Sequence, residues 1–75
     1  MIPVDVTIHN KDRKIGAMVK ALSFEIDGPK SVQGASKDFL EANGYLRFHF
    51  STQDKATEFK DAVSRYLPQL LAQVQ

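Results

Sequence analysis

The chain has no cysteine and no tryptophan among its 75 residues, and its ten Lys+Arg residues almost balance its nine Asp+Glu residues. The absence of cysteine excludes disulfide bonds, thiolate chemistry and the usual structural zinc sites, and it agrees with a reducing, intracellular compartment. A formal net charge of +1 gives no global field that would favour nucleic acid or a membrane surface. The sequence also lacks a signal-peptide pattern and any apolar run near the ~20 residues that span a bilayer.

The length of the chain allows one domain, residues 1–75. A domain this small buries only ~60% of the surface of its unfolded chain, so most of its apolar residues are needed in the core. The sequence contains no glycine-rich phosphate loop, no G-x-S-x-G and no metal-spaced cluster of His, Asp or Glu. We therefore expect no catalytic residues, no metal and no cofactor, and we predict that the protein is not an enzyme.

Two segments alternate apolar and polar residues in the way typical of half-buried strands. They are residues 2–9 (IPVDVTIH) and residues 45–50 (YLRFHF). In the second segment, the outward side carries Tyr45, Arg47 and His49, and the apolar residues that alternate with these three point inward. An aromatic and basic strand face of this kind can stack bases or bind an acidic peptide.

Two other segments fit more than one structure. Residues 14–22 suit a helix, because their apolar residues recur at three- and four-residue steps, but they also suit a strand that continues to Phe24 and Ile26. We favour the extended structure and keep the helix as the alternative. For residues 37–42 (KDFLEA) we favour a strand that turns back through Asn43-Gly44, a strong hairpin signal. The alternative is one short helix over residues 36–43 (SKDFLEAN) capped by Gly44.

The last third of the chain predicts an amphipathic helix over residues 52–67, with Ser51 as its N-cap. Pro68 predicts a kink or the end of this helix. Beyond it, three apolar residues extend the buried stripe past the width of a small sheet and are candidate contacts of a homodimer: Leu70, Leu71 and Val74. The expected fold is α+β, an antiparallel sheet of about four strands packed against this single C-terminal helix.

Residues 48–71 (FHFSTQDKATEFKDAVSRYLPQLL) resemble the last strand and closing helix of the PH-like domain of the large core subunit of TFIIH, a transcription and DNA-repair factor. The FHFS and DAV steps carry the resemblance beyond the apolar stripe. The chain before Phe48 is too short for every strand of that domain, so the resemblance implies a reduced PH-like fold and a nuclear location. It also implies a sheet face that binds acidic, aromatic-bearing segments. Arg47 and Lys60 stand at two contact positions, although Arg47 replaces an uncharged amide residue.

These observations predict a non-catalytic protein–protein interaction module for acidic and hydrophobic peptide segments, with no membrane role. The predicted partner-binding residues are Tyr45, Arg47, His49 and Lys60. A basic stretch would enlarge this surface if it lay beside Arg47: Lys11, Arg13, Lys14 and Lys20. One alternative is single-stranded nucleic-acid binding on the same face. Another is a homo-oligomeric structural protein joined through the C-terminal apolar residues.

Overall fold

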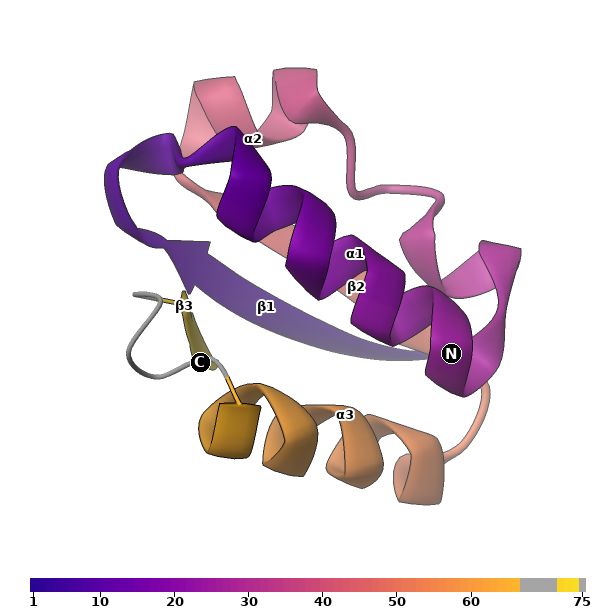
Figure 1. Ribbon diagram of the computed structural model, residues 1–75. Coiled ribbons are helices and arrows are strands. Elements are labelled where there is room, and N and C mark those ends of the chain that lie inside the picture. The colour runs from indigo at the N-terminus through magenta and orange to yellow at the C-terminus, as the bar shows by residue number, and fades with distance from the viewer. Residues whose placement is uncertain (67–71, 75) are drawn as a thin grey trace.

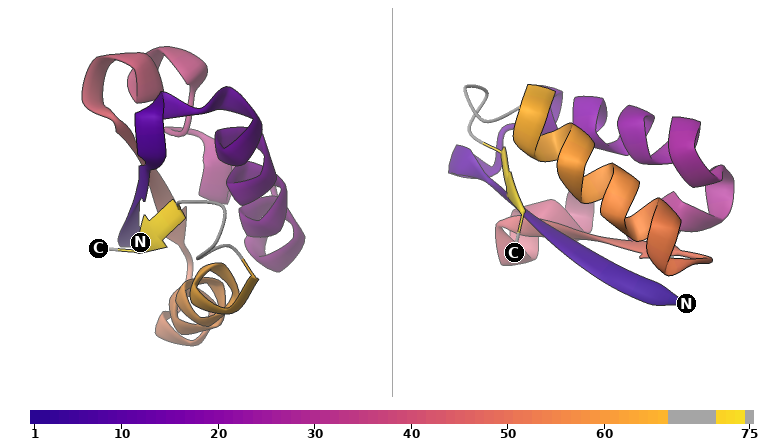
Figure 2. Two further views of the ribbon diagram at one scale, coloured as in Figure 1. Left: turned by 60° about the vertical axis from the view of Figure 1, so that its left-hand side comes forward. Right: turned by 90° about the horizontal axis from the view of Figure 1, so that it is seen from below.

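The computed structural model describes residues 1–66 and 72–74. Along the chain, the elements are β1 (Ile2–Ile8), the 3₁₀ helix η1 (His9–Lys11), α1 (Arg13–Asp27), the 3₁₀ helix η2 (Pro29–Val32), α2 (Lys37–Asn43), β2 (Tyr45–Phe50), α3 (Gln53–Tyr66) and β3 (Ala72–Val74). Strands β1 and β2 pair antiparallel over their length, and the short β3 pairs with the other edge of β1 (Figure 1). Helices α1 and α3 lie side by side on one face of this sheet (Figure 2).

The predicted fold class is wrong. In place of about four strands closed by one helix, or a reduced PH-like fold, the described residues form two long antiparallel strands, a three-residue third strand and three α-helices. The protein is a small α+β domain in which most of the chain between β1 and β2 is helical. Within residues 1–66 and 72–74, none of the helices has the length and apolar character needed to cross a membrane.

Helix α1 replaces the extended structure that we favoured over residues 14–22. Its N-cap is Asp12, whose side chain accepts hydrogen bonds from the backbone N–H groups of Lys14 (2.8 Å) and Ile15 (3.2 Å). Satisfying two otherwise unpaired donors stabilises the first turn. The helical period then buries Val19 and leaves Phe24, the residue through which we expected a strand to continue, on the outside.

Helix α2 replaces the predicted hairpin. The Ser36 hydroxyl accepts a hydrogen bond from the N–H of Phe39 (3.0 Å) and caps the first turn. Gly44 ends the helix in the left-handed conformation at φ 79°, and its N–H donates to the carbonyl of Leu40 (2.8 Å). The Asn-Gly dipeptide therefore serves as a helix C-cap, which needs a positive φ just as a hairpin turn does.

Helix α3 confirms the predicted C-terminal helix with a small shift. The Thr52 hydroxyl accepts a hydrogen bond from the N–H of Lys55 (3.2 Å), so Thr52 caps the helix and not Ser51. The predicted kink at Pro68 lies outside the described residues, and so do the predicted oligomer contacts Leu70 and Leu71. Val74 is placed only by the pairing of β3 with β1.

The core lies between the sheet and helices α1 and α3. Alternate residues of β1 and β2 point into it, as the sequence predicted. The largest of these inward side chains belong to β2. The Phe59 ring of α3 fills its centre, with its centroid 5.0 Å from that of Phe48 and 4.8 Å from that of Phe50. Because the core uses one side of the sheet, the intervening residues of both strands lie on the side without α1 and α3.

Candidate functional site

The side of the sheet that α1 and α3 leave uncovered is the candidate site, and we call it the open face. It is made of three directly opposed residue pairs of β1 and β2: Pro3 with His49, Asp5 with Arg47, and Thr7 with Tyr45. The sequence predicted that the three β2 residues share an outward face, and the burial pattern of the strand confirms this. Antiparallel pairing places them against Pro3, Asp5 and Thr7 of β1, which complete the surface.

A two-point ion pair lies at the centre of the open face. The Arg47 Nε donates to Asp5 Oδ1 (2.8 Å), and Nη2 donates to Oδ2 (3.0 Å). The hydrogen bonds from Arg47 lower the pKa of Asp5, and the same contact raises the pKa of Arg47. The positive charge of Arg47 is therefore locally balanced. A guanidinium has five N–H donors, so this pairing leaves three of them to other acceptors.

Aromatic rings occupy one end of the open face. The ring of Tyr45 meets that of Phe39, from α2, edge to face, with centroids 5.3 Å apart and planes at 84°. The guanidinium carbon of Arg47 lies 5.8 Å from the centre of the Tyr45 ring, within the range of a cation–π contact. Helix α2, which the sequence analysis expected to be a hairpin strand, thus adds the aromatic residue Phe39 to the site.

His49 lies at the opposite end of β2. The loop that precedes α2 runs beside it, since a Cβ on Gly34 would be 3.8 Å from the His49 ring and 3.7 Å from the carbonyl oxygen of Arg47. The other histidine, His9, follows the far end of β1. Because the register pairs Pro3 with His49, the two histidines are at opposite ends of the sheet.

The structure does not bring Lys60 to the open face. Lys60 belongs to α3, which packs against the opposite side of the sheet. The side of the sheet on which a helix packs is set by the topology, and the sequence of the helix does not indicate it. Of the four predicted partner-binding residues, Tyr45, Arg47 and His49 lie together, and Lys60 lies apart from them.

Two residues of the basic stretch lie away from the open face. Arg13 and Lys20 belong to α1 and line a small cavity between α1 and α2, on the helix-covered side of the sheet. The Lys11 ammonium donates to the backbone carbonyl of Glu41 (2.6 Å). Arg13 and Lys20 therefore do not enlarge the open face, whereas Lys11 lies beside Gly44, which precedes Tyr45.

The local sequence only weakly indicates two polar contacts that the structure contains, those of Asp5 and Asp27. Asp5 was placed on the polar side of its strand, but only the strand register pairs it with Arg47. Asp27 ends α1 and accepts hydrogen bonds from the N–H (2.7 Å) and hydroxyl (3.1 Å) of Ser51. Among the residues that the structure describes, no cluster of three His, Cys, Asp or Glu side chains is placed to hold a metal ion.

Two carboxylates should make the fold sensitive to acid. The hydrogen bond from the backbone N–H of Ser51 lowers the pKa of Asp27, as Arg47 lowers that of Asp5. Because both pKa values are lower in the folded protein, the stability they contribute is present above the unfolded value of about 3.9. It is lost as the pH falls through the folded-state values.

We therefore expect the urea midpoint to fall as the pH drops below about 4. Asp27→Asn should lower the midpoint at neutral pH and flatten its dependence on acid, because the amide cannot gain a proton in this range. Urea unfolding followed by far-UV circular dichroism across the acid range measures both effects. A variant as sensitive to acid as the wild-type protein would contradict this role of Asp27.

Comparison with models of protein families, with curated proteins and with solved structures found no match to the chain. The resemblance of residues 48–71 to the PH-like domain therefore stays a prediction.

Proposed function

We propose that the protein is a non-catalytic protein–protein interaction module that binds an acidic, aromatic-bearing peptide segment on the open face. The observation that carries the proposal is the Arg47 guanidinium. Asp5 fixes it in place, the Tyr45 ring flanks it, and it lies on a sheet surface that α1 and α3 do not cover. Tyr, Phe and Arg are residue types enriched at protein interfaces.

Binding would use two parts of this surface. A carboxylate of the partner accepts from the guanidinium N–H groups that Asp5 does not use, as in other charge-assisted pairs. An aromatic side chain of the partner packs against the ring pair of Tyr45 and Phe39, which favours edge-to-face contacts. Because Asp5 cancels the charge of Arg47 at long range, steering by charge is weak, and we expect a transient complex with a small buried area.

Charge substitutions on the two sides of the sheet test this proposal. Arg47→Glu should abolish binding of an acidic, Phe-containing peptide, since it replaces the donor with a carboxylate. Arg47→Gln should weaken binding without placing two like charges across the strands. Lys60→Glu makes the same change of charge on α3 and should leave the affinity within twofold. Isothermal titration calorimetry measures the affinities, and far-UV circular dichroism checks the fold.

Asp5 gives a test in the opposite direction. Asp5→Asn releases Arg47 from its ion pair, so the acidic peptide should bind more tightly and with a steeper dependence on salt. Equal binding by Arg47→Gln and the wild-type protein would contradict the proposal. A loss of binding in Lys60→Glu equal to that in Arg47→Glu would contradict the assignment to the open face.

Single-stranded nucleic acid is the alternative ligand of this face, because bases stack on aromatic rings and Arg contacts phosphates. A formal net charge of +1 gives little of the positive field that nucleic-acid binding uses, which favours the peptide. The proposal includes an intracellular location. A nuclear location and a role in transcription or DNA repair rest only on the resemblance of residues 48–71.

A further inference from the structure

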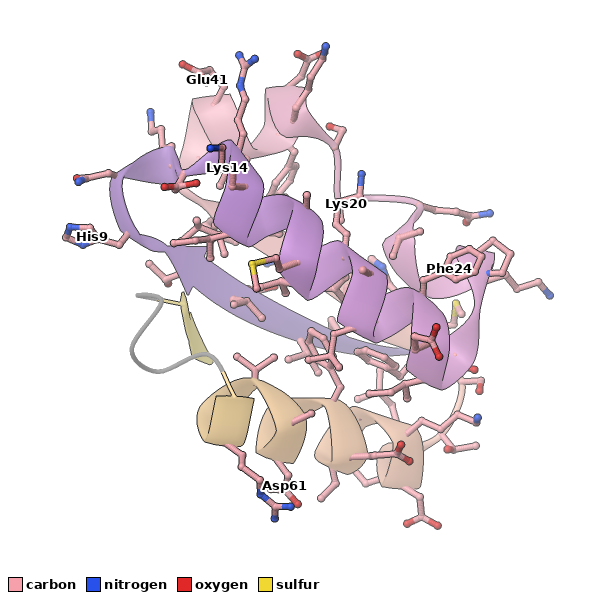
Figure 3. The ribbon with its side chains drawn as sticks, in the orientation of Figure 1. His9, Lys14, Lys20, Phe24, Glu41 and Asp61 are labelled. Carbon is pink, nitrogen blue, oxygen red and sulfur yellow. The ribbon has the colours of Figure 1, made fainter. Side chains whose placement is uncertain are left out.

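The outward side of α1 is a second exposed surface, opposite the open face. The exposed residues of α1 run along the helix in this order: Arg13, Lys14, Ala17, Met18, Ala21, Phe24 and Glu25. Met18 is 47% exposed and Phe24 is 53% exposed, and Met1 is the only other exposed large apolar residue among residues 1–65. Figure 3 shows Lys14 near the beginning of the helix and Phe24 near its end. An apolar stretch therefore lies between a cation and an anion.

The charges of this surface are opposite to those that stabilise a helix. The helix macrodipole favours acidic residues in the first turn and basic residues in the last turn. After the N-cap Asp12, the first turn of α1 contains no acidic residue, and its last turn contains no basic residue. Lys14 and Glu25 instead lie at the unfavourable ends. Their placement is explained if each meets the opposite end of another helix.

We propose that two copies of the chain associate through the outward sides of their α1 helices, packed antiparallel about a two-fold axis between Met18 and Ala21. Lys14 lies four residues before Met18, and Glu25 lies four residues after Ala21. The symmetry therefore brings Lys14 of each copy opposite Glu25 of the other, and Met18 opposite Ala21. The surface is complementary to itself, as a two-fold interface requires.

The flank of α1 provides room for the second copy. A shallow hollow beside the last turns of the helix is lined by Lys20, Ala21, Phe24, Glu25 and, from η2, Val32. In the proposed dimer, the apolar stem of Lys14 from the second copy packs on the Ala21 and Phe24 side of this hollow, with its ammonium beside the Glu25 carboxylate and away from Lys20. Packing there covers Phe24 and Met18, and long side chains such as Lys commonly cover apolar surface in this way.

Charge reversals on the full chain test the dimer. Sedimentation velocity over a concentration series should show a monomer–dimer equilibrium for the wild-type protein. Lys14→Glu and Glu25→Lys should each weaken self-association at least tenfold, because symmetry creates two like-charge contacts. Lys30→Glu reverses a charge on η2, outside this surface, and should leave the dissociation constant unchanged.

Mixing the two weakened variants gives the decisive result. A heterodimer of Lys14→Glu with Glu25→Lys has opposite charges at both contacts, so the equimolar mixture should associate although neither variant does so alone. The double variant Lys14→Glu/Glu25→Lys should also dimerise. A wild-type chain that stays monomeric at every concentration would overturn the proposal. Dimers of unchanged affinity in both single variants would place the contact elsewhere and overturn it too.

Discussion

Phe59→Ala should lower the free energy of unfolding by about 3–5 kcal/mol, the usual cost of removing a phenyl ring from a packed core. The Phe59 side chain is fully buried and contacts the rings of Phe48 and Phe50. It joins α3 to β2, so its loss leaves a cavity between the two layers. Small domains are stable by only about 5–15 kcal/mol, and this one substitution should remove a large part of that stability.

Urea unfolding followed by far-UV circular dichroism measures this change. Phe59→Leu retains part of the volume and should fall between the wild-type protein and Phe59→Ala. A loss of less than about 1 kcal/mol in Phe59→Ala would contradict the central position of this ring, because even removing one methylene from a core usually costs about that much.

Gly28→Ala should cost about 1–3 kcal/mol, for a reason that lies in the backbone. Gly28 has φ 76° and ψ −167°, a region that is almost restricted to glycine. A Cβ at this position would meet no atom within 4 Å, so crowding makes no contribution. The conformation lets Gly28 donate to the carbonyl of Phe24 (2.8 Å) while its own carbonyl accepts from the Ser31 hydroxyl (2.8 Å).

Gly34→Ala is the matched control for this prediction. Gly34 does not have a positive φ, and a Cβ there would make ordinary contacts, the nearest at 3.7 Å. The substitution Gly34→Ala should be neutral or slightly stabilising, because alanine restricts the conformations of the unfolded chain. If the urea midpoints of the two variants were equal, the backbone of residue 28 would not be the source of the effect.

The sequence predicted the elements whose pattern has one interpretation. Strict alternation identified β1 and β2 and their inward residues, and a long three- and four-residue period identified α3. The errors at α1 and α2 share a cause. Apolar residues over 14–22 fit two periods, and Asn43-Gly44 supplies the positive φ of a hairpin or of a helix end. The caps Asp12 and Ser36 were the deciding local signals.

The candidate site was predictable only within one strand. Tyr45, Arg47 and His49 share a face because they alternate in β2, which requires no knowledge of the fold. The pairing of Arg47 with Asp5 depends on strand register, and the separation of Lys60 depends on the side of the sheet that α3 covers. Neither follows from local sequence.

The two proposed surfaces lie on opposite sides of the molecule, and this has a functional consequence. A dimer joined through α1 would leave both open faces exposed at its outer ends. Each dimer would then bind two peptide segments, or one chain that carries two such segments. Linked binding of this kind can raise overall affinity by about 10²–10⁴-fold, which would compensate for a weak single site.

Amide-resolved NMR titration of the wild-type protein with an acidic, Phe-containing peptide at physiological salt shows whether the peptide binds on the open face, with a short single-stranded RNA titrated in parallel. Binding on the open face should give saturable shifts for the peptide that centre on Tyr45 to His49 and on Asp5, with the amide of Lys60 unmoved. Shifts with RNA alone, or peptide shifts confined to α1 and α3, would contradict it.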